Sequence, residues 1–380
     1  MKLKSVSIRG LNNKLDGYYE FHNDINIVTG INGCGKTTFL KILWYAISGN
    51  IERLISDISF EAFNMETSHF RLSLFNVDGS IQWQHIANEI KQNGFINLGE
   101  YNSADEIGVL KSLIIKDRTS SLFFPTFRRI EGAYLKTIAN ICSMGKTERM
   151  LSEIVNKPID AFSIKIQDDF QKLSDTLTSL EHKFICSVST HDLGYLLRLH
   201  HAETTEKIDE YSRALNKSLI SELENIKSGI KDSKDESLAI VSKLQREVAD
   251  VDDRRDELLQ PFKVLSELVT KVMHYKGVKL DDFTIGQSDD AIDSRLLSAG
   301  EQQMLSFLCY NAFYEDSVIF IDEPELSLHP DWQRRLFPNL MKQQSSNQFI
   351  VATHSPFIYS KYEDKEIMDK EIILSEEKGE

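Results

Sequence analysis

The first chemistry-bearing pattern is a glycine-rich loop, Gly30 to Thr37, which fits G-x-x-x-x-G-K-[ST] without a mismatch. It follows a strand-like apolar run, Ile25 to Val28, and precedes an apolar helical face between Phe39 and Ile47. Glycines let backbone N–H groups close around phosphate oxygens, and a helix N-terminus favours anions. We therefore predict that Lys36 reaches the β- and γ-phosphates of ATP and that the Thr37 hydroxyl ligates Mg²⁺. The predicted nucleotide-binding residues are Asn32, Gly33, Cys34, Gly35, Lys36, Thr37 and Thr38.

A second pattern joins an apolar strand to two acids. Residues 318–321 are wholly apolar and are followed by Asp322 and Glu323. Strands this apolar are usually buried on both faces, as in a parallel sheet, and residues 348–352 have the same character. We predict that Asp322 binds the metal, directly or through water, and that Glu323 is the general base that positions the attacking water. The alternative is two exposed acids at a strand end, and the glycine-rich loop argues against it.

A third pattern, Leu297 to Gln302, precedes an apolar helical run over 300–314, and we call it the signature segment. Ser298 is typical of a helix N-cap, and the N–H groups that follow it form an anion site. One interpretation is that Ser298 is only a cap. The other is that the segment contacts the γ-phosphate held by a second copy, so that two copies form two equivalent sites. The residues assigned to this role in trans are Ser298, Ala299, Gly300 and Glu301.

His354 follows the last apolar strand, within Ala352-Thr353-His354-Ser355-Pro356. Its place predicts a contact with the γ-phosphate or the attacking water, so we count it with Lys36 and Glu323 as catalytic. A lone histidine is more often structural, and His329, in the segment 325–330 that we expect at the seam of a dimer, is interpreted as an interface or structural residue rather than a ligand.

Two further pairs leave their roles open. Arg128 and Arg129 follow a predicted strand over 120–124, and they either sense phosphate, couple the site to the helical insertion, or are surface charges. Gln82 and Gln84 are candidates for a glutamine that bridges to Mg²⁺, and neither is convincing. They lie in a predicted hairpin, 71–85, whose turn contains Asp78-Gly79.

Composition narrows the class of protein. The net charge of −14 argues against a generally basic nucleic-acid coat, although it allows a local basic patch. No apolar run approaches 18 residues, so we expect no membrane span and no membrane partner. The four cysteines form no C-x-x-C pair, which excludes a zinc knuckle and is typical of a reducing compartment. We therefore expect a cytoplasmic protein.

Three regions follow from the patterns. We expect an α/β fold with a mixed sheet, formed by residues 1–135 and 286–380 and interrupted by a helical or coiled-coil insertion at 136–285. The insertion contains an apolar 4-3-4-3-4 spacing from Ile166 to Phe184 and a polar tip at 231–237. Each predicted helix is under 30 residues, and the last ends near Pro261. An extended arm and a compact helical subdomain explain the pattern equally well.

Together these motifs resemble the ABC-type ATPases of the RecF, chromosome-maintenance (SMC) and OLD group. The resemblance rests on residues 7–11, 32–38, 297–302, 321–330 and 352–356, whereas 136–280 match nothing recognisable. The Glu-Leu-Ser-Leu-His-Pro version at 325–330 resembles ATPases of bacterial anti-phage operons, such as PtuA-like proteins of Septu systems and retrons, or the PARIS ATPase. OLD-type proteins continue into a Toprim nuclease, whereas this sequence ends 26 residues after His354.

The resemblance implies an Mg-ATP-binding and hydrolysing ABC-type ATPase that forms a homodimer or higher homo-oligomer around ATP. It would regulate a separate effector, an HNH or Toprim-type nuclease or a toxin, in anti-phage defence. One alternative is a DNA-repair or DNA-organising ATPase with nucleic acid as its direct ligand. Another is a nucleotide-gated scaffold with little turnover.

Overall fold

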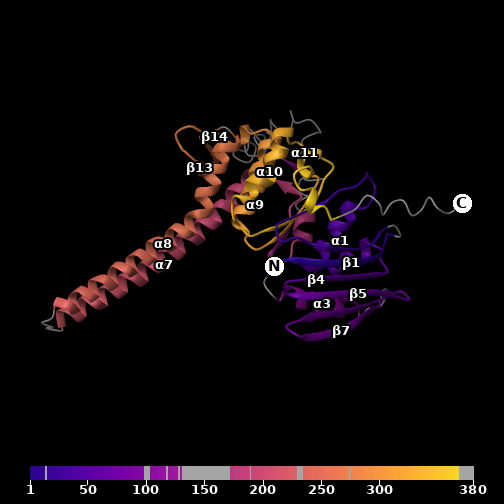
Figure 1. Ribbon diagram of the computed structural model, residues 1–380, viewed down its shortest axis with the longest axis horizontal. Coiled ribbons are helices and arrows are strands. Elements are labelled where there is room, and N and C mark those ends of the chain that lie inside the picture. Colours follow the sequence, from indigo (N-terminus) through magenta and orange to yellow (C-terminus); the bar gives the residue numbers. More distant parts are fainter. Residues whose placement is uncertain are drawn as a thin grey trace, which may run out of the picture. The chain divides into compact units, whose positions relative to one another are not determined.

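The computed structural model in Figure 1 describes residues 1–12, 15–97, 103–116, 119–126, 129–130, 172–188, 190–228, 234–273 and 275–367. The chain forms two compact units, one of Met1–Ser189 with Arg295–Glu380 and one of Thr190–Ser294. The first unit is α/β and contains both ends of the chain, while the second is mainly helical. The predicted α/β fold with a helical insertion is therefore confirmed.

A five-stranded parallel sheet forms the centre of the first unit, in the order β10-β8-β15-β16-β3. Its strands are β10 (His182–Phe184), β8 (Ser121–Phe124), β15 (Val318–Asp322), β16 (Gln348–Ala352) and β3 (Ile25–Val28). Every residue of the last four is buried, as predicted for apolar strands inside a parallel sheet. Asp322 pairs with Ala352, and Ala352 pairs with Val28, so these strands end at one common edge.

Helix α1 (Lys36–Ser48) starts inside the glycine-rich loop and is buried all round, with residues 42–48 inaccessible in succession. The Trp44 ring lies 5.5 Å from that of Phe123 in the parallel sheet, between centroids. Phe39 makes an edge contact, at 5.0 Å, with Tyr19 of a second sheet. The helix is therefore packed between the two sheets. This packing explains why its apolar residues are not confined to one face of the helix.

The second sheet is antiparallel, in the order β2-β1-β4-β5-β6-β7. Its strands are β2 (Leu15–Glu20), β1 (Leu3–Leu11), β4 (Ala62–Thr67), β5 (Phe70–Val77), β6 (Ser80–Ala87) and β7 (Ile90–Asn97). The predicted hairpin is β5–β6, and its turn residues Asp78 and Gly79 have φ of 48° and 82°. Asp-Gly suits two successive positive φ angles, so this prediction is confirmed.

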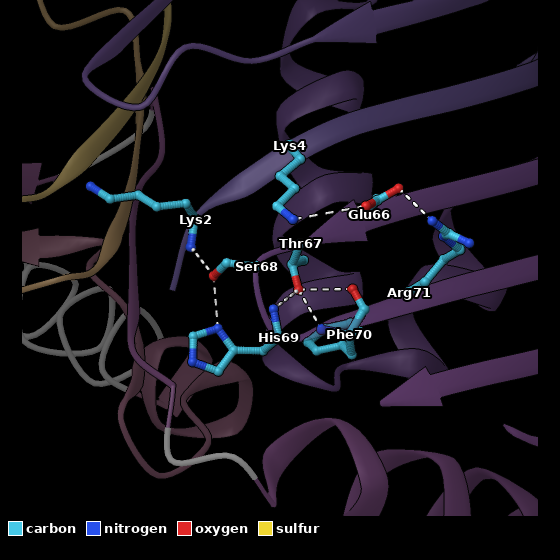
Figure 2. A network of polar contacts seen from close by, with 8 residues as sticks. All are labelled: Lys2, Lys4, Glu66, Thr67, Ser68, His69, Phe70 and Arg71. Atoms are coloured by element: carbon cyan, nitrogen blue, oxygen red, sulfur yellow. Dashed lines mark hydrogen bonds and ion pairs between the residues drawn. The ribbon is translucent and has the colours of Figure 1, made fainter. Parts of the chain in front are cut away.

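Polar contacts fasten the start of β1 to the turn between β4 and β5 (Figure 2). The Lys2 N–H donates to Ser68 Oγ at 3.0 Å, and the Ser68 N–H donates to the Lys2 carbonyl at 2.7 Å. Thr67 Oγ1 accepts from the N–H groups of His69 and Phe70, which closes the turn. The polar residues in Figure 2 therefore have a structural role: they hold the turn between β4 and β5 against the start of β1.

The remaining elements of the first unit surround the sheets. They are α2 (Ile51–Asp57), α3 (Ser103–Ile115), β9 (Arg129–Ile130), β11 (Ser187–Val188), α9 (Ala299–Phe313), α10 (Pro330–Met341), α11 (Pro356–Tyr359) and the 3-10 turn η2 (Glu363–Lys365). Phe124 at the end of β8 packs edge-on against Phe307 and Tyr310 of α9, at 5.1 and 5.6 Å. In the described part of the chain no helix is both long and apolar enough to cross a membrane.

The second unit contains two long helices, α7 (Thr190–Ser228) and α8 (Lys234–Met273), which run side by side (Figure 1). Ser218 donates to Glu247 at 2.8 Å, and Arg254 lies 5.1 Å above the Tyr211 ring. In both pairs the two residue numbers add up to 465. The helices are therefore antiparallel and keep one register along this stretch. A small sheet follows, made of β12 (Gly277–Leu280), β13 (Phe283–Gly286) and β14 (Ala291–Asp293), and the 3-10 turn η1 (Ser294–Leu296) leads out.

The helices correct two predictions. They have 39 and 40 residues rather than fewer than 30, and Pro261 lies inside α8 rather than at its end. A proline inside a helix removes a hydrogen bond, at about 3 kcal/mol. Next to it, Phe262 packs against His201 and Phe283, at 5.6 and 6.2 Å. Tertiary packing of this kind can override a local stop signal.

The start of the insertion also differs from the predicted one. Residues 172–188 belong to the first unit, and the helical unit spans Thr190–Ser294 rather than 136–285. The predicted heptad ends in β10, where Phe184 stacks on Phe123 with centroids 5.3 Å apart, so it does not continue as a helix there. Its first residues, Ile166 and Phe170, lie outside the described residues.

Candidate nucleotide site

The glycine-rich loop lies between β3 and α1, as predicted. Gly30, Gly33 and Gly35 have φ of 140°, 83° and 95°, a region in which other residues are strained. A Cβ added at Gly33 or Gly35 would meet no atom within 4 Å, so this side of the loop is open. Lys36 is only 6% exposed, and its Nζ donates to the carbonyls of Gly30 and Ile31, both at 3.0 Å. The ammonium group therefore lies within the curve of the loop.

Thr37 and Asp322, the two predicted metal ligands, are in direct contact although 285 positions separate them. Thr37 Oγ1 donates to Asp322 Oδ2 at 2.8 Å, and the Thr126 hydroxyl donates to the same oxygen. Asp322 is 1% exposed. The loop, the end of β15 and the segment after β8 thus bring three oxygen-bearing side chains together at one edge of the sheet.

These oxygens suit Mg²⁺, which prefers oxygen ligands and usually binds through one or two protein groups plus substrate phosphates and water. Within the described residues, no group of three or more His, Cys, Asp or Glu side chains could hold a metal ion. A Mg²⁺ ion held by Thr37 and Asp322 would take its further oxygens from water or from the phosphates of a nucleotide. The neighbouring glycine-rich loop is the place from which phosphates could supply them.

Glu323 leaves β15 in a left-handed conformation, with φ of 49°. Its N–H donates to the Ala352 carbonyl at 2.8 Å, and its carbonyl accepts from Leu326 N at 3.3 Å. Non-glycine residues in this region are strained and persist only where surrounding structure fixes them. The backbone thus turns sharply at the predicted base, directly after the predicted metal ligand.

The signature segment leads into α9 through a complete capping box. Ser298 Oγ accepts from the Glu301 N–H at 3.3 Å, and the Glu301 carboxylate accepts from the Ser298 N–H at 2.7 Å. The predicted cap is confirmed. Ser298 and Ala299 are exposed, whereas Gly300 is buried, and a Cβ on Gly300 would lie 2.4 Å from the Ser327 carbonyl oxygen. Gly300 is therefore required for packing within its own chain.

His354 is exposed just beyond β16. Its N–H donates to Glu325 Oε1 at 2.7 Å, and the Thr353 hydroxyl donates to Glu325 Oε2 at 2.9 Å. We call residues 352–356 the histidine segment. The Glu325 carboxylate thus joins this segment to the turn after Asp322. The imidazole belongs to the same edge of the sheet as Asp322 because β15 and β16 are parallel neighbours.

The other candidate residues have different neighbours. Gln82 and Gln84 lie in the middle of β6, where they pair with residues of β5 and β7. His329 is the N-cap of α10 and accepts from the Asp331 N–H at 3.3 Å, a structural role. The Arg128 and Arg129 side chains lie outside the described residues.

Sequence reasoning missed Thr126 and Glu325. Thr126 had a usable signal, because it follows a wholly apolar strand, and loops at the carboxyl ends of neighbouring parallel strands meet at one edge. Glu325 had no such signal. Its contacts with Thr353 and His354 depend on the pairing of β15 with β16.

The model of the AAA_21 family, described as “AAA domain, putative AbiEii toxin, Type IV TA system”, matches residues 25–360. The chain belongs to this family. The match begins at β3 and extends past His354, so it includes the glycine-rich loop, both acids and the signature segment. The predicted resemblance is thereby confirmed.

Among curated proteins, this AAA_21 chain is similar to three relatives. It is 31% identical over 88 residues to the “Retron Ec83 probable ATPase” of Escherichia coli, covering 20% of this chain and 16% of the relative. It is 26% identical over 148 residues to the “Retron Vc95 probable ATPase” of Vibrio cholerae, covering 33% and 29%. It is 40% identical over 63 residues to “Endonuclease GajA” of Bacillus cereus, covering 15% and 11%. The matches thus span less than a third of each relative.

Two solved SMC head structures are similar to most of this AAA_21 chain, at low scores. The Smc head domain with an extended coiled coil bound to the C-terminal domain of ScpA, from Pyrococcus furiosus, is 13% identical. That match has a TM-score of 0.38 and covers 94% of this chain and 91% of the other. The SmcHead bound to the C-winged helix domain of ScpA is 12% identical with a TM-score of 0.40, covering 95% and 91%.

Proposed function

We propose that this chain is a Mg²⁺-dependent ATPase. One observation carries the proposal: Thr37 of the glycine-rich loop bonds directly to the buried Asp322, with Lys36 and Glu323 next to them in sequence. This combination supports a phosphate cradle, a pair of metal-binding oxygens and an acid at one sheet edge. An ordinary glycine turn would require none of these contacts.

In this mechanism the loop N–H groups and Lys36 hold the β- and γ-phosphates. Thr37 and Asp322 would hold Mg²⁺, which would supply positive charge against the charge that develops on the phosphate oxygens. Glu323 accepts the proton of the attacking water and orients it. His354 contacts the γ-phosphate or that water.

We further propose that two copies enclose the nucleotide. In support, Ser298 and Ala299 are exposed at the N-terminus of α9, a position that favours anions, while the glycine-rich loop contacts Asp322 of its own chain. The signature segment of one copy would then cover the γ-phosphate held by the other. A two-fold dimer would contain two such sites.

Replacement of Glu323 by Gln tests this function. The variant should bind Mg-ATP, lose about a hundredfold or more in phosphate release, and accumulate as an ATP-bound dimer by light scattering. Glu315→Gln is the matched control, because Glu315 is an exposed acid just before the opposite end of the same strand. Undiminished turnover in Glu323→Gln would overturn the assigned base. A wild-type chain that binds ATP without turnover would instead be a nucleotide-gated scaffold.

We also propose that the ATPase regulates a separate effector, a nuclease or toxin, in anti-phage defence. The retron ATPases and the GajA endonuclease among its relatives support this role. The paired helices α7 and α8 offer a surface for the effector or for the trigger. Nothing in the ATPase chemistry requires 39- and 40-residue helices.

The helix register allows a defined test of that role. Residues 211–254 can be replaced by a Gly-Ser linker of about four residues, which spans the separation of neighbouring helices. The shortened chain should hydrolyse ATP at close to the wild-type rate and fail to control its effector in a phage-plating assay with the neighbouring genes. Full protection by the shortened chain would exclude this stretch as the effector site.

A further inference from the structure

Glu325 lies where the turn after the catalytic strand meets the histidine segment. Both oxygens of its carboxylate are used: Oε1 accepts the His354 N–H at 2.7 Å and Oε2 accepts the Thr353 hydroxyl at 2.9 Å. Hydrogen bonds to an ionised carboxylate are among the stronger ones in proteins. One side chain therefore holds two successive residues at the end of β16.

The backbone of Glu325 is held by hydrogen bonds as well as its side chain. Its carbonyl accepts from the Leu328 N–H at 3.0 Å and from Gln333 Nε2 at 3.3 Å. Gln333 also accepts a hydrogen bond from the Ser355 hydroxyl, one residue beyond His354. The turn and the histidine segment are thus joined at two places, on either side of His354.

The same turn carries Glu323, two residues before Glu325. The Glu323 backbone is strained, with φ of 49°, and its neighbour Pro324 accepts a hydrogen bond from the buried Gln303 of α9 at 3.0 Å. Movement of the turn would shift Glu323 and His354 together as long as the Glu325 contacts persist.

We infer that Glu325 is a positioning residue of the ATPase site, which holds His354 against the turn that follows the catalytic strand. This inference rests on the proposed function. Glu325 does not contact the nucleotide in this account and acts only through His354. Its loss should therefore affect the chemical step more than nucleotide binding.

The test combines Glu325→Ala and Glu325→Gln with His354→Ala in a double-mutant cycle. Glu325→Ala should lower kcat about tenfold to hundredfold, the usual range for residues that orient a reacting group, and leave KM for ATP within about twofold. The double variant Glu325→Ala/His354→Ala should be no slower than His354→Ala alone. Glu325→Gln retains one acceptor oxygen and should recover part of the rate. Glu363→Gln, an exposed acid in η2, is the control.

A second readout does not depend on turnover. In protein labelled with ¹⁵N-histidine, the His354 amide is one of ten signals and can be assigned by its loss in His354→Ala. A bond to a carboxylate should shift this signal downfield, and Glu325→Ala should remove the shift. Thr353→Val removes the second contact, together with the bond that Thr353 Oγ1 accepts from the Ser355 N–H at 3.0 Å, and covers the case in which Glu325→Ala does not fold.

Three outcomes distinguish the positioning role of Glu325 from the ATPase proposal. Multiplicative loss in the double variant, or an unchanged His354 amide in Glu325→Ala, would overturn the positioning role while leaving the ATPase proposal intact. A wild-type chain without turnover would remove the ATPase proposal, and the amide shift would then still decide whether Glu325 holds His354. Non-additive loss with the amide shift removed supports the inference.

Discussion

The glycine-rich loop and the signature segment differ in what their own chain does for them. The loop is completed within the chain, because Thr37 contacts Asp322 and Lys36 is almost fully buried. The signature segment is closed on itself by the Ser298–Glu301 capping box, and its Ser298 and Ala299 remain exposed. In the proposed mechanism the loop half binds the nucleotide, and the exposed signature segment contacts the nucleotide of a second copy. This difference between the two regions is the reason for proposing a shared site.

We expect the largest effect on ATP turnover from a change in the glycine-rich loop. Lys36→Ala removes the ammonium group inside the loop and should lower turnover by about two to three orders of magnitude, as the loss of one preorganised charge-stabilising group commonly does. ATP affinity should fall with it, measured by fluorescent-nucleotide titration. Lys41→Ala, on the same helix, should change neither quantity. Unaltered ATP affinity in Lys36→Ala would remove the loop from the site.

Ser298→Asp should have a smaller and more selective effect. Aspartate caps helices as well as serine, so the melting temperature should hold, while the new charge opposes the phosphate of the other copy. We expect unchanged ATP affinity of the monomer, about a tenfold or greater loss of turnover, and loss of the ATP-induced dimer in light scattering. If Ser298→Asp hydrolyses ATP normally, Ser298 is only a cap.

Gly300→Ala should act mainly on stability. The added Cβ would lie 2.4 Å from the Ser327 carbonyl oxygen, and relieving this overlap should lower the free energy of unfolding by about 1–3 kcal/mol. Urea unfolding measures this value. Gly108→Ala is the control, because a Cβ at Gly108 in α3 meets nothing within 4 Å and should be neutral or stabilising. Equal stability of the two variants would refute the packing role of Gly300.

The sequence predicted the parts of the site that follow a local pattern. The loop, the apolar strands and the Ser298 cap depend on residues close in sequence, so spacing sufficed. Thr126 and Glu325 were missed because their contacts depend on which strands are neighbours in the sheet. The predicted end of α8 was wrong because Pro261 is only a local stop signal, whereas Phe262 beside it packs against His201 and Phe283.

The shared site is tested most directly by mixing two impaired variants, Lys36→Ala and Ser298→Asp. In a mixed dimer one site carries both changes, and the other combines an intact loop with an intact signature segment. If subunits exchange freely and the two sites are independent, an equimolar mixture should recover about a quarter of the wild-type rate, because half of the dimers then hold one intact site. A mixture no more active than the mean of the separate variants would contradict the account.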